Sequence, residues 1–222
     1  MNLPQLSTAL IALAASAVLT PLVMLVVTRL GIVDQPDGRR KLHGRAVPLA
    51  GGLAVWLAMV AAVWGGRYVG GPSPPEGGDP FWPSFLIASC LLCVLGLADD
   101  AWKLRARHKL LGQFAAVGVI VWGGLVVRSV NFCGWDVDLG VMAVPFTIFW
   151  LLGAINAMNL IDGMDGLAAT VGVTIGSALA VMAALNGSLG ESVVAAGLVG
   201  GVLGFLVYNF PPARVFLGDT GS

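Results

Sequence analysis

Long apolar runs with almost no charge divide this sequence, and they constrain its fold more than any other feature. The runs cover about 8–28, 49–64, 83–98, 110–127, 141–158, 167–185 and 193–208. Many of them approach or exceed about 18 residues, the length that crosses the hydrocarbon core of a bilayer. Backbone polar groups must be paired within lipid, which favours helices. We therefore predict an all-α, polytopic membrane bundle with about seven transmembrane helices, forming a single integral membrane domain over residues 1–222.

The composition excludes a soluble enzyme. Hydrophobic residues make up 57% of the chain and charged residues only 11%, whereas soluble domains carry about 25% charged residues. Twelve Lys and Arg residues balance twelve Asp and Glu residues. Because the net charge is zero, the positions of the charges carry the information.

The basic residues indicate how the chain is oriented. Ten of the twelve Lys and Arg residues lie in the segments 29–48, 99–109, 159–166 and 209–222. An N-terminus outside the cell puts all four segments in the cytoplasm, as the positive-inside rule requires. We therefore expect a multi-pass protein of the bacterial cytoplasmic membrane whose polar motifs face the cytoplasm.

Two adjacent carboxylates, Asp99 and Asp100, follow the third apolar run directly. A pair of acids at a membrane boundary is costly unless a cation lies nearby. Alternatively, the two acids only end a helix, although Lys or Arg would do so on this side with less repulsion. We favour a functional role.

Two further polar groups are predicted at the same face of the membrane. Asn159, Asp162 and Asp165 recur at every third residue, a spacing that keeps most of them on one face of a helix. The segment 218–222 places Asp219 between glycines, in a turn that could direct N–H groups at a phosphate. A plain turn of this composition is also common.

Taken together, these acids indicate phosphoryl transfer at a lipid boundary. Oxygen ligands alone favour Mg²⁺, or Mn²⁺, over zinc. Nearby bases could neutralise phosphate oxygens, or could simply set the topology. These bases are Arg39, Arg40, Lys41, His43, Lys103 and Lys109.

The motifs resemble those of the polyprenyl-phosphate N-acetylhexosamine-1-phosphate transferase family, which includes the phospho-MurNAc-pentapeptide translocase. The resemblance rests on five segments in order along the chain: GIVDQP (31–36), RKLH (40–43), LADD (97–100), NAMNLIDGMDG (156–166) and VFLGDTGS (215–222). KLLGQ (109–113) and NFPPAR (209–214) look more like the branch that starts O-antigen, enterobacterial common antigen or teichoic-acid linkage units.

The resemblance implies an enzyme that moves a sugar 1-phosphate, most often GlcNAc 1-phosphate, from a UDP-sugar to polyprenyl phosphate and releases UMP. By matching, Asp219 would bind Mg²⁺ and Asp100 would support the metal or the geometry, while Asp99 would act as a base toward the lipid phosphate.

The remaining matched residues would contact the substrates. Asn159, Asp162 and Asp165 would bind the nucleotide or position the pyrophosphate, and Asp162 and Asp165 would be catalytic residues. Phe216 would hold the uracil ring. Lys41, His43, Lys103 and Lys109 would bind phosphate. The expected partners are a UDP-sugar, the polyprenyl phosphate lipid and the membrane, with no nucleic acid; a homodimer stays an open alternative.

Members of this family continue beyond the motif at 218–222, with further spans and a basic loop that contains histidine. We therefore expect these 222 residues to be part of a longer transferase and to be poorly active alone. Peptidoglycan synthesis is the alternative within the family. A transporter is the alternative of another class, but transporters carry ionisable groups near the bilayer midplane, and here the span centres are apolar. An inactive scaffold is a third alternative.

Overall fold

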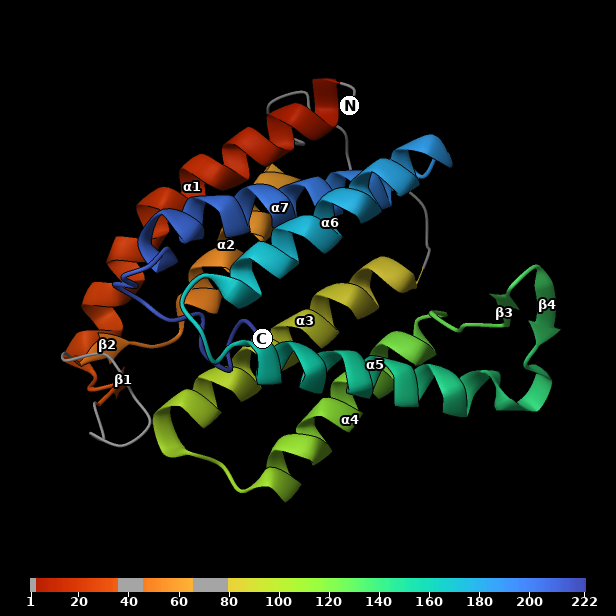
Figure 1. The fold of residues 1–222 in the computed structure, drawn as a ribbon, viewed down its shortest axis with the longest axis horizontal. Helices are drawn as coiled ribbons and strands as arrows, with labels where there is room; N and C mark the ends of the chain where they lie inside the picture. Colours follow the sequence, from red (N-terminus) through yellow and green to blue (C-terminus); the bar gives the residue numbers. More distant parts are fainter. Residues whose placement is uncertain (1–2, 36–45, 66–79) are drawn as a thin grey trace.

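The computed structural model describes residues 3–35, 46–65 and 80–222, and within them the chain is mainly helical (Figure 1). Seven α-helices are present: α1 (Leu3–Arg29), α2 (Gly51–Gly65), α3 (Phe81–Trp102), α4 (Ala106–Trp122), α5 (Ala143–Ile161), α6 (Leu167–Leu185) and α7 (Leu189–Asn209). Two short antiparallel pairs join β1 (Val33–Asp34) to β2 (Val47–Pro48) and β3 (Ser129–Phe132) to β4 (Trp135–Asp138), and a 3₁₀ turn, η2 (Gly140–Met142), precedes α5.

The seven helices predicted from the apolar runs are confirmed, and they identify a multi-pass membrane protein. Five described helices, α1, α3, α5 with its preceding turn, α6 and α7, are long and apolar enough to cross a membrane. The other two are shorter, with 15 residues in α2 and 17 in α4. Helix α4 ends at Trp122, five residues before the predicted boundary, because Gly123 and Gly124 follow and Gly124 has a φ of +103°.

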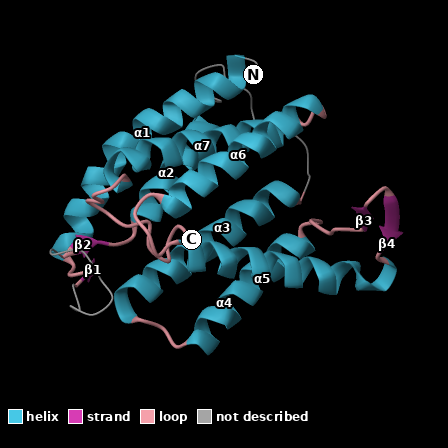
Figure 2. Ribbon diagram, viewed as in Figure 1, coloured by secondary structure: helices cyan, strands magenta, loops and turns pink. Residues whose placement is uncertain are grey.

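The helices form two groups (Figure 1). Helix α7 packs against α1, α2 and α6, while α3, α4 and α5 pack in sequence beside them. The loop of residues 210–222, called here the C-terminal loop, lies between the two groups, near the ends of α3 and α5 (Figure 1). The two strand pairs lie at opposite ends of the molecule (Figure 2).

Glycines allow α7 to approach α1 closely. A Cβ on Gly200 or Gly204 would overlap the backbone carbonyl of Ala9 or Leu13 in α1. The hydroxyl of Tyr208 also donates a 2.9 Å hydrogen bond to the carbonyl of Ala17. Without a hydrophobic driving force between helices in lipid, such close contacts hold the bundle together.

The C-terminal loop is bonded to the start of α2. The N–H of Phe216 donates to the carbonyl of Pro48 (2.9 Å), and the N–H groups of Gly51 and Gly52 donate to the carbonyls of Phe216 (3.0 Å) and Leu217 (2.9 Å). On its other side the loop touches α3, where a Cβ at Gly96 would overlap the carbonyl of Asp219. These contacts hold Asp219 beside the end of α3.

Candidate active site

Four of the five predicted aspartates come together where the C-terminal loop meets α3 and α5. We call Asp99, Asp100, Asp162 and Asp219 the acid cluster. Asp99 and Asp100 are buried in the last turns of α3, Asp162 is half-buried just after α5, and Asp219 is half-buried in the loop. The expectation that these motifs share one end of the bundle is confirmed.

Asp100 holds the C-terminal loop. Its Oδ1 accepts a 3.0 Å hydrogen bond from the N–H of Asp219, and its Oδ2 accepts bonds from the N–H (3.3 Å) and hydroxyl (2.7 Å) of Thr220. Gly218 precedes these donors with a φ of +73°, a conformation that turns successive N–H groups toward one acceptor. Both oxygens of Asp100 are therefore occupied by the protein itself.

Lys109 lies between two acids of the cluster. Its Nζ is 3.0 Å from Oδ2 of Asp99 and 3.0 Å from Oδ2 of Asp219. It also donates to Oδ1 of Asn159 at 3.4 Å, and Nδ2 of Asn159 donates to Asp219 and, at 3.0 Å, to the hydroxyl of Ser222. The ammonium group offsets the repulsion between Asp99 and Asp219.

The connection between α3 and α4 orients Asp99. Lys103 ends α3 in the left-handed conformation, with a φ of +51°, and its N–H donates to the carbonyl of Asp99 at 2.8 Å. The next N–H, that of Leu104, donates to Oδ1 of Asp99 at 2.7 Å. One oxygen of Asp99 is thus held by the backbone, and the other faces Lys109.

Asp162 has a strongly altered acidity. Burial raises its pKa, the N–H of Gly218 lowers it by hydrogen bonding, and the charges of Asp100 and Asp219 raise it; together they move the pKa from the ordinary value of 3.8 to about 7. Asp162 is therefore partly protonated near neutral pH. Perturbed carboxyl groups of this kind are enriched at functional sites.

The pKa of Asp219 is shifted in the opposite direction. Burial alone would raise its pKa, but interactions with Asp99, Lys109 and Asn159 outweigh burial and hold the pKa below its usual value. Asp219 therefore stays charged, and its side chain keeps 27% of its surface exposed. It is the acid of the cluster best suited to meet a cation from outside.

Other predicted site residues lie apart from the cluster or outside the described residues. Asp165 is exposed and accepts a 2.9 Å bond from the N–H of Ala213, because α5 ends at Ile161 and the helical spacing does not continue to position 165. Lys103 is exposed, and within the described ranges it makes no ion pair. Phe216 is half-buried. Lys41 and His43 fall in the segment that the structure does not describe.

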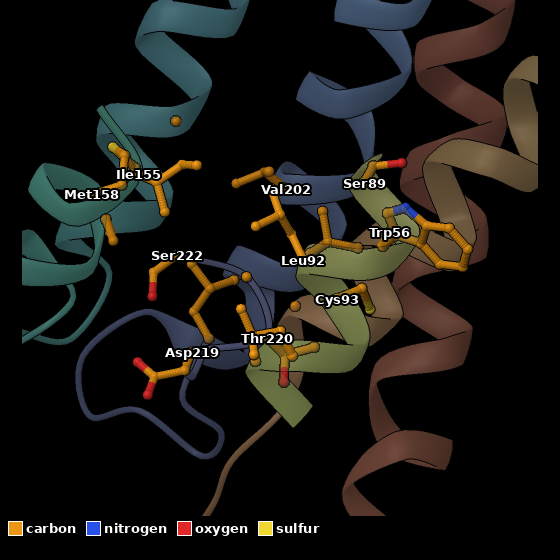
Figure 3. Close-up of a pocket in the computed structure, with 18 of the residues that line it drawn as sticks. Trp56, Ser89, Leu92, Cys93, Ile155, Met158, Val202, Asp219, Thr220 and Ser222 are labelled. Atoms are coloured by element: carbon orange, nitrogen blue, oxygen red, sulfur yellow. The ribbon is translucent and has the colours of Figure 1, made fainter. Parts of the chain in front are cut away.

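An apolar cavity of about 410 Å³ opens beside the acid cluster (Figure 3). Helices α2 to α7 and the C-terminal loop line it, mostly with aliphatic side chains such as Leu92, Ile155 and Val202. Its polar end carries Lys109, Gln113, Asp219, Thr220 and Ser222. The cavity therefore joins charged groups to a hydrocarbon-like wall.

Sequence reasoning gave no role to Gln113, Asn156 or Thr220. Gln113 lies one turn after Lys109 in α4, is 2% exposed, and accepts a 3.1 Å bond from Nδ2 of Asn156. The sequence does contain a signal for the first two. Gln113 lies four residues after Lys109, and Asn156 lies three residues before Asn159, and residues at these spacings share a helix face. Thr220 could not be found this way, since it lies in the C-terminal loop and its partner Asp100 lies in α3, far away in the sequence.

Comparison with known proteins assigns the family. The family model described as glycosyl transferase family 4 matches residues 82–222, which carry the whole acid cluster. The chain belongs to this family. Membership of glycosyl transferase family 4 agrees with the resemblance of the motifs and argues against the transporter alternative.

The curated proteins similar to this chain are named as transferases of two kinds. A probable undecaprenyl-phosphate N-acetylglucosaminyl 1-phosphate transferase of Bacillus subtilis is 38% identical over 216 residues, 96% of this chain and 58% of that protein. A decaprenyl-phosphate N-acetylglucosaminephosphotransferase of Mycobacterium tuberculosis is 33% identical over 241 residues, 100% of this chain and 58% of that protein. A phospho-N-acetylmuramoyl-pentapeptide-transferase of Caldanaerobacter subterraneus is 42% identical over 144 residues, 58% of this chain and 45% of that protein. The chain thus spans about half the length of these relatives.

The acid cluster offers ligands for an Mg²⁺ ion that is shared with a substrate phosphate. It does not offer enough ligands for a metal site made of protein side chains alone. Among the described residues, no three His, Cys, Asp or Glu side chains converge as a metal-binding group. Lys109 and backbone donors already compensate Asp99 and Asp100, so the proximity of the acids requires no metal. Mg²⁺ usually binds one or two carboxylates, with waters and substrate phosphates completing the shell. Asp219 meets that requirement because it is charged and partly exposed.

Proposed function

We propose that the complete protein transfers a sugar 1-phosphate, GlcNAc 1-phosphate, from a UDP-sugar to undecaprenyl phosphate, releases UMP and so starts a cell-envelope glycan. The observation that carries the proposal is the group of Asp99, Lys109 and Asp219 at the polar end of an apolar cavity. Transfer of this kind brings a water-soluble phosphate to a lipid phosphate. It needs charged groups and an apolar wall side by side.

The division of roles follows the contacts. Oδ2 of Asp99, 3.0 Å from Nζ of Lys109, is the acceptor for a proton of the lipid phosphate. Lys109 stabilises negative charge on the phosphates, and Asn159 orients Asp219. A lipid phosphate is already an oxygen nucleophile once its charge is screened, so a direct transfer is sufficient.

Asp219 would hold Mg²⁺ in this proposal, with Asp100 supporting it through the N–H of Asp219. When bound, Mg²⁺ would screen the phosphate oxygens and make the phosphorus easier to attack. Asp162 would take up or release a proton near neutral pH, since its pKa is about 7.

The proposed orientation puts the acid cluster at the cytoplasmic face of the cell membrane. Its support is the concentration of Lys and Arg in the segments at this end of the bundle. A UDP-sugar is a cytoplasmic metabolite in this proposal, so the donor and the acid cluster lie on the same side.

Phospho-MurNAc-pentapeptide transfer is the second candidate. It is supported by the 42% identity to the Caldanaerobacter relative over the segment of 144 residues. The two candidates share the proposed chemistry at the phosphates and differ in the donor sugar.

The decisive experiment measures UMP release by the complete protein in detergent with undecaprenyl phosphate and either UDP-GlcNAc or UDP-MurNAc-pentapeptide. We expect release with UDP-GlcNAc that depends on the lipid, stops with EDTA and returns with Mg²⁺ or Mn²⁺. Asp219→Asn should remove most turnover, whereas Asp136→Asn, in strand β4 away from the C-terminal loop (Figure 1), should not. UMP release that needs no lipid, or that survives chelation, would contradict the proposal.

A further inference from the structure

The β3–β4 hairpin has one apolar and one polar face. Its register pairs Ser129 with Asp138, Val130 with Val137, Asn131 with Asp136 and Phe132 with Trp135. Residues opposite one another in an antiparallel pair point to the same side, and successive residues alternate. The two Val residues, Phe132 and Trp135 therefore share one face, and the four polar residues share the other.

The polar face is satisfied within the hairpin. Nδ2 of Asn131 donates to Oδ1 of Asp136 at 2.7 Å, and Oδ1 of Asp138 accepts a 2.9 Å bond from the N–H of Gly140. These bonds stabilise the two strands and leave the carboxylates in contact with water.

Three of the four side chains on the apolar face are exposed within the described residues, and Val130 is half-buried. Phe132 is 73% exposed, Trp135 is 79% exposed and Val137 is 51% exposed. An isolated two-stranded hairpin is marginally stable in water, and large aromatic groups left in water forgo the free energy of burial. Contact with a partner would therefore stabilise this face.

The position of the hairpin points to the partner. The hairpin lies beyond the ends of α4 and α5 that are farthest from the C-terminal loop (Figures 1 and 2). The residues that join it to these helices are also apolar and exposed, namely Trp122 at the end of α4 and Val141 and Met142 before α5. Farther along α5, Phe149 and Trp150 are exposed on a helix long enough to span a membrane. The exposed apolar surface thus continues from the spanning helix to the hairpin.

We propose that the apolar face of the β3–β4 hairpin binds the lipid surface of the leaflet opposite the acid cluster. Trp and Phe suit the boundary between headgroups and acyl chains, where Trp is enriched in membrane proteins. The acidic face then points to water. The hairpin holds the ends of α4 and α5 at a fixed depth, which contributes to the tilt of the two helices that carry Lys109 and Asn159.

Site-directed spin labelling tests this contact. The three cysteines are first replaced (Cys90→Ser, Cys93→Ala and Cys133→Asn, since Cys133 has a φ of +52°). Labels are attached to the complete protein in phosphatidylcholine–phosphatidylglycerol vesicles through Phe132→Cys or Val137→Cys on the apolar face. Asn131→Cys and Asp136→Cys on the polar face are the matched controls.

Oxygen, which concentrates in lipid, and a water-soluble nickel chelate report the surroundings of each label. We expect the ratio of oxygen to nickel collisions at positions 132 and 137 to exceed that at 131 and 136 severalfold. Equal nickel access at all four positions would show a hairpin free in water and would overturn the proposal. Exclusion of both reagents from 132 and 137 would show a protein partner, such as a second copy, and would overturn it as well.

Discussion

The N–H of Asp219 donates a 3.0 Å hydrogen bond to the carboxylate of Asp100, across 119 residues of sequence. The bond ties the C-terminal loop to the end of α3. Asp100 and Asp99 are neighbours in the sequence, yet their surroundings differ: among the described residues Asp100 accepts from the loop, whereas Asp99 faces the ammonium group of Lys109. The paired carboxylates therefore make different contacts: Asp100 holds the C-terminal loop, and Asp99 is the one to which the proposed function gives a chemical role.

Asp100→Ala should destabilise the protein. Three donors from Asp219 and Thr220 would lose a buried, charged acceptor, and a hydrogen bond to a charged group contributes about 1.5–3 kcal/mol. We expect a loss of about 2–4 kcal/mol, measured as a lower midpoint of thermal unfolding in detergent. Thr220→Val removes only the hydroxyl donor and should cost less, about 1.5 kcal/mol. An Asp100→Ala protein as stable as the parent would contradict the assigned contact.

Lys109→Gln should reduce the proposed transfer far more than Lys103→Gln. The first substitution removes the cation that lies 3.0 Å from both Asp99 and Asp219, and loss of one such electrostatic group typically costs about 100-fold to 1,000-fold in turnover. Lys103 is an exposed lysine at the end of α3, six residues before Lys109, which makes it the matched control. Rates of UMP release for the two variants of the complete protein check the prediction. Equal losses would mean that both lysines act only through overall charge.

Asp162 should make stability depend on pH. Its pKa is raised from 3.8 to about 7 in the folded protein, so between these values the folded state binds a proton that the unfolded state has released. The stabilising contribution is complete below about pH 4 and is lost as the pH rises to about 7. Asp162→Asn, which cannot ionise, should therefore remove this part of the decline in unfolding midpoint with pH.

The pH measurement is made with EDTA present, because a bound cation would favour the charged carboxylate. Asp165→Asn removes an exposed acid three residues later and is the control. An Asp162→Asn protein whose unfolding midpoint declines between pH 4 and 7 as steeply as that of the parent would show that Asp162 does not carry the effect.

The helices could be predicted because their signal is local. An apolar run indicates by itself where a helix lies. The predicted helix end is wrong where glycines interrupt the run, as at Gly123 and Gly124 after α4. The two faces of the β3–β4 hairpin could not be predicted, because Asp136 and Asp138 stand in a short segment between two apolar runs. Their alternation with Trp135 and Val137 becomes informative only once the strand register is known.

The sequence predicts which residues form the acid cluster, but it does not predict the contacts that they make. Alternating spans bring Asp99, Asp162 and Asp219 to one end of the bundle, which follows from topology alone. The donors to Asp100 are largely backbone N–H groups, which every sequence contains, so no motif shows them. Part of the repulsion that suggested a metal is offset by Lys109, whose reach from α4 depends on tertiary packing.

The hydrogen bond between Gln113 and Asn156 should position Lys109 and Asn159 for the proposed transfer. Each pair connects α4 to α5, at 3.1 Å for Gln113–Asn156 and 3.4 Å for Lys109–Asn159. Because Gln113 lies one turn from Lys109 and is buried, losing its bond would let the two helices shift against each other. Gln113→Met keeps the length of the side chain and removes the acceptor.

We expect Gln113→Met to lower kcat about 10-fold, since a misplacement of about 1 Å costs up to about 100-fold, with little change in UDP-sugar affinity. Asn156→Leu should have a similar effect, and the double variant should be hardly worse than either single one, because both remove the same bond. Cys90→Ala, an exposed position in α3, provides a control for a substitution elsewhere in the bundle. Additive losses in the double variant would mean that Gln113 and Asn156 act separately. A loss of unfolding midpoint without a loss of kcat would mean that the bond only stabilises the fold.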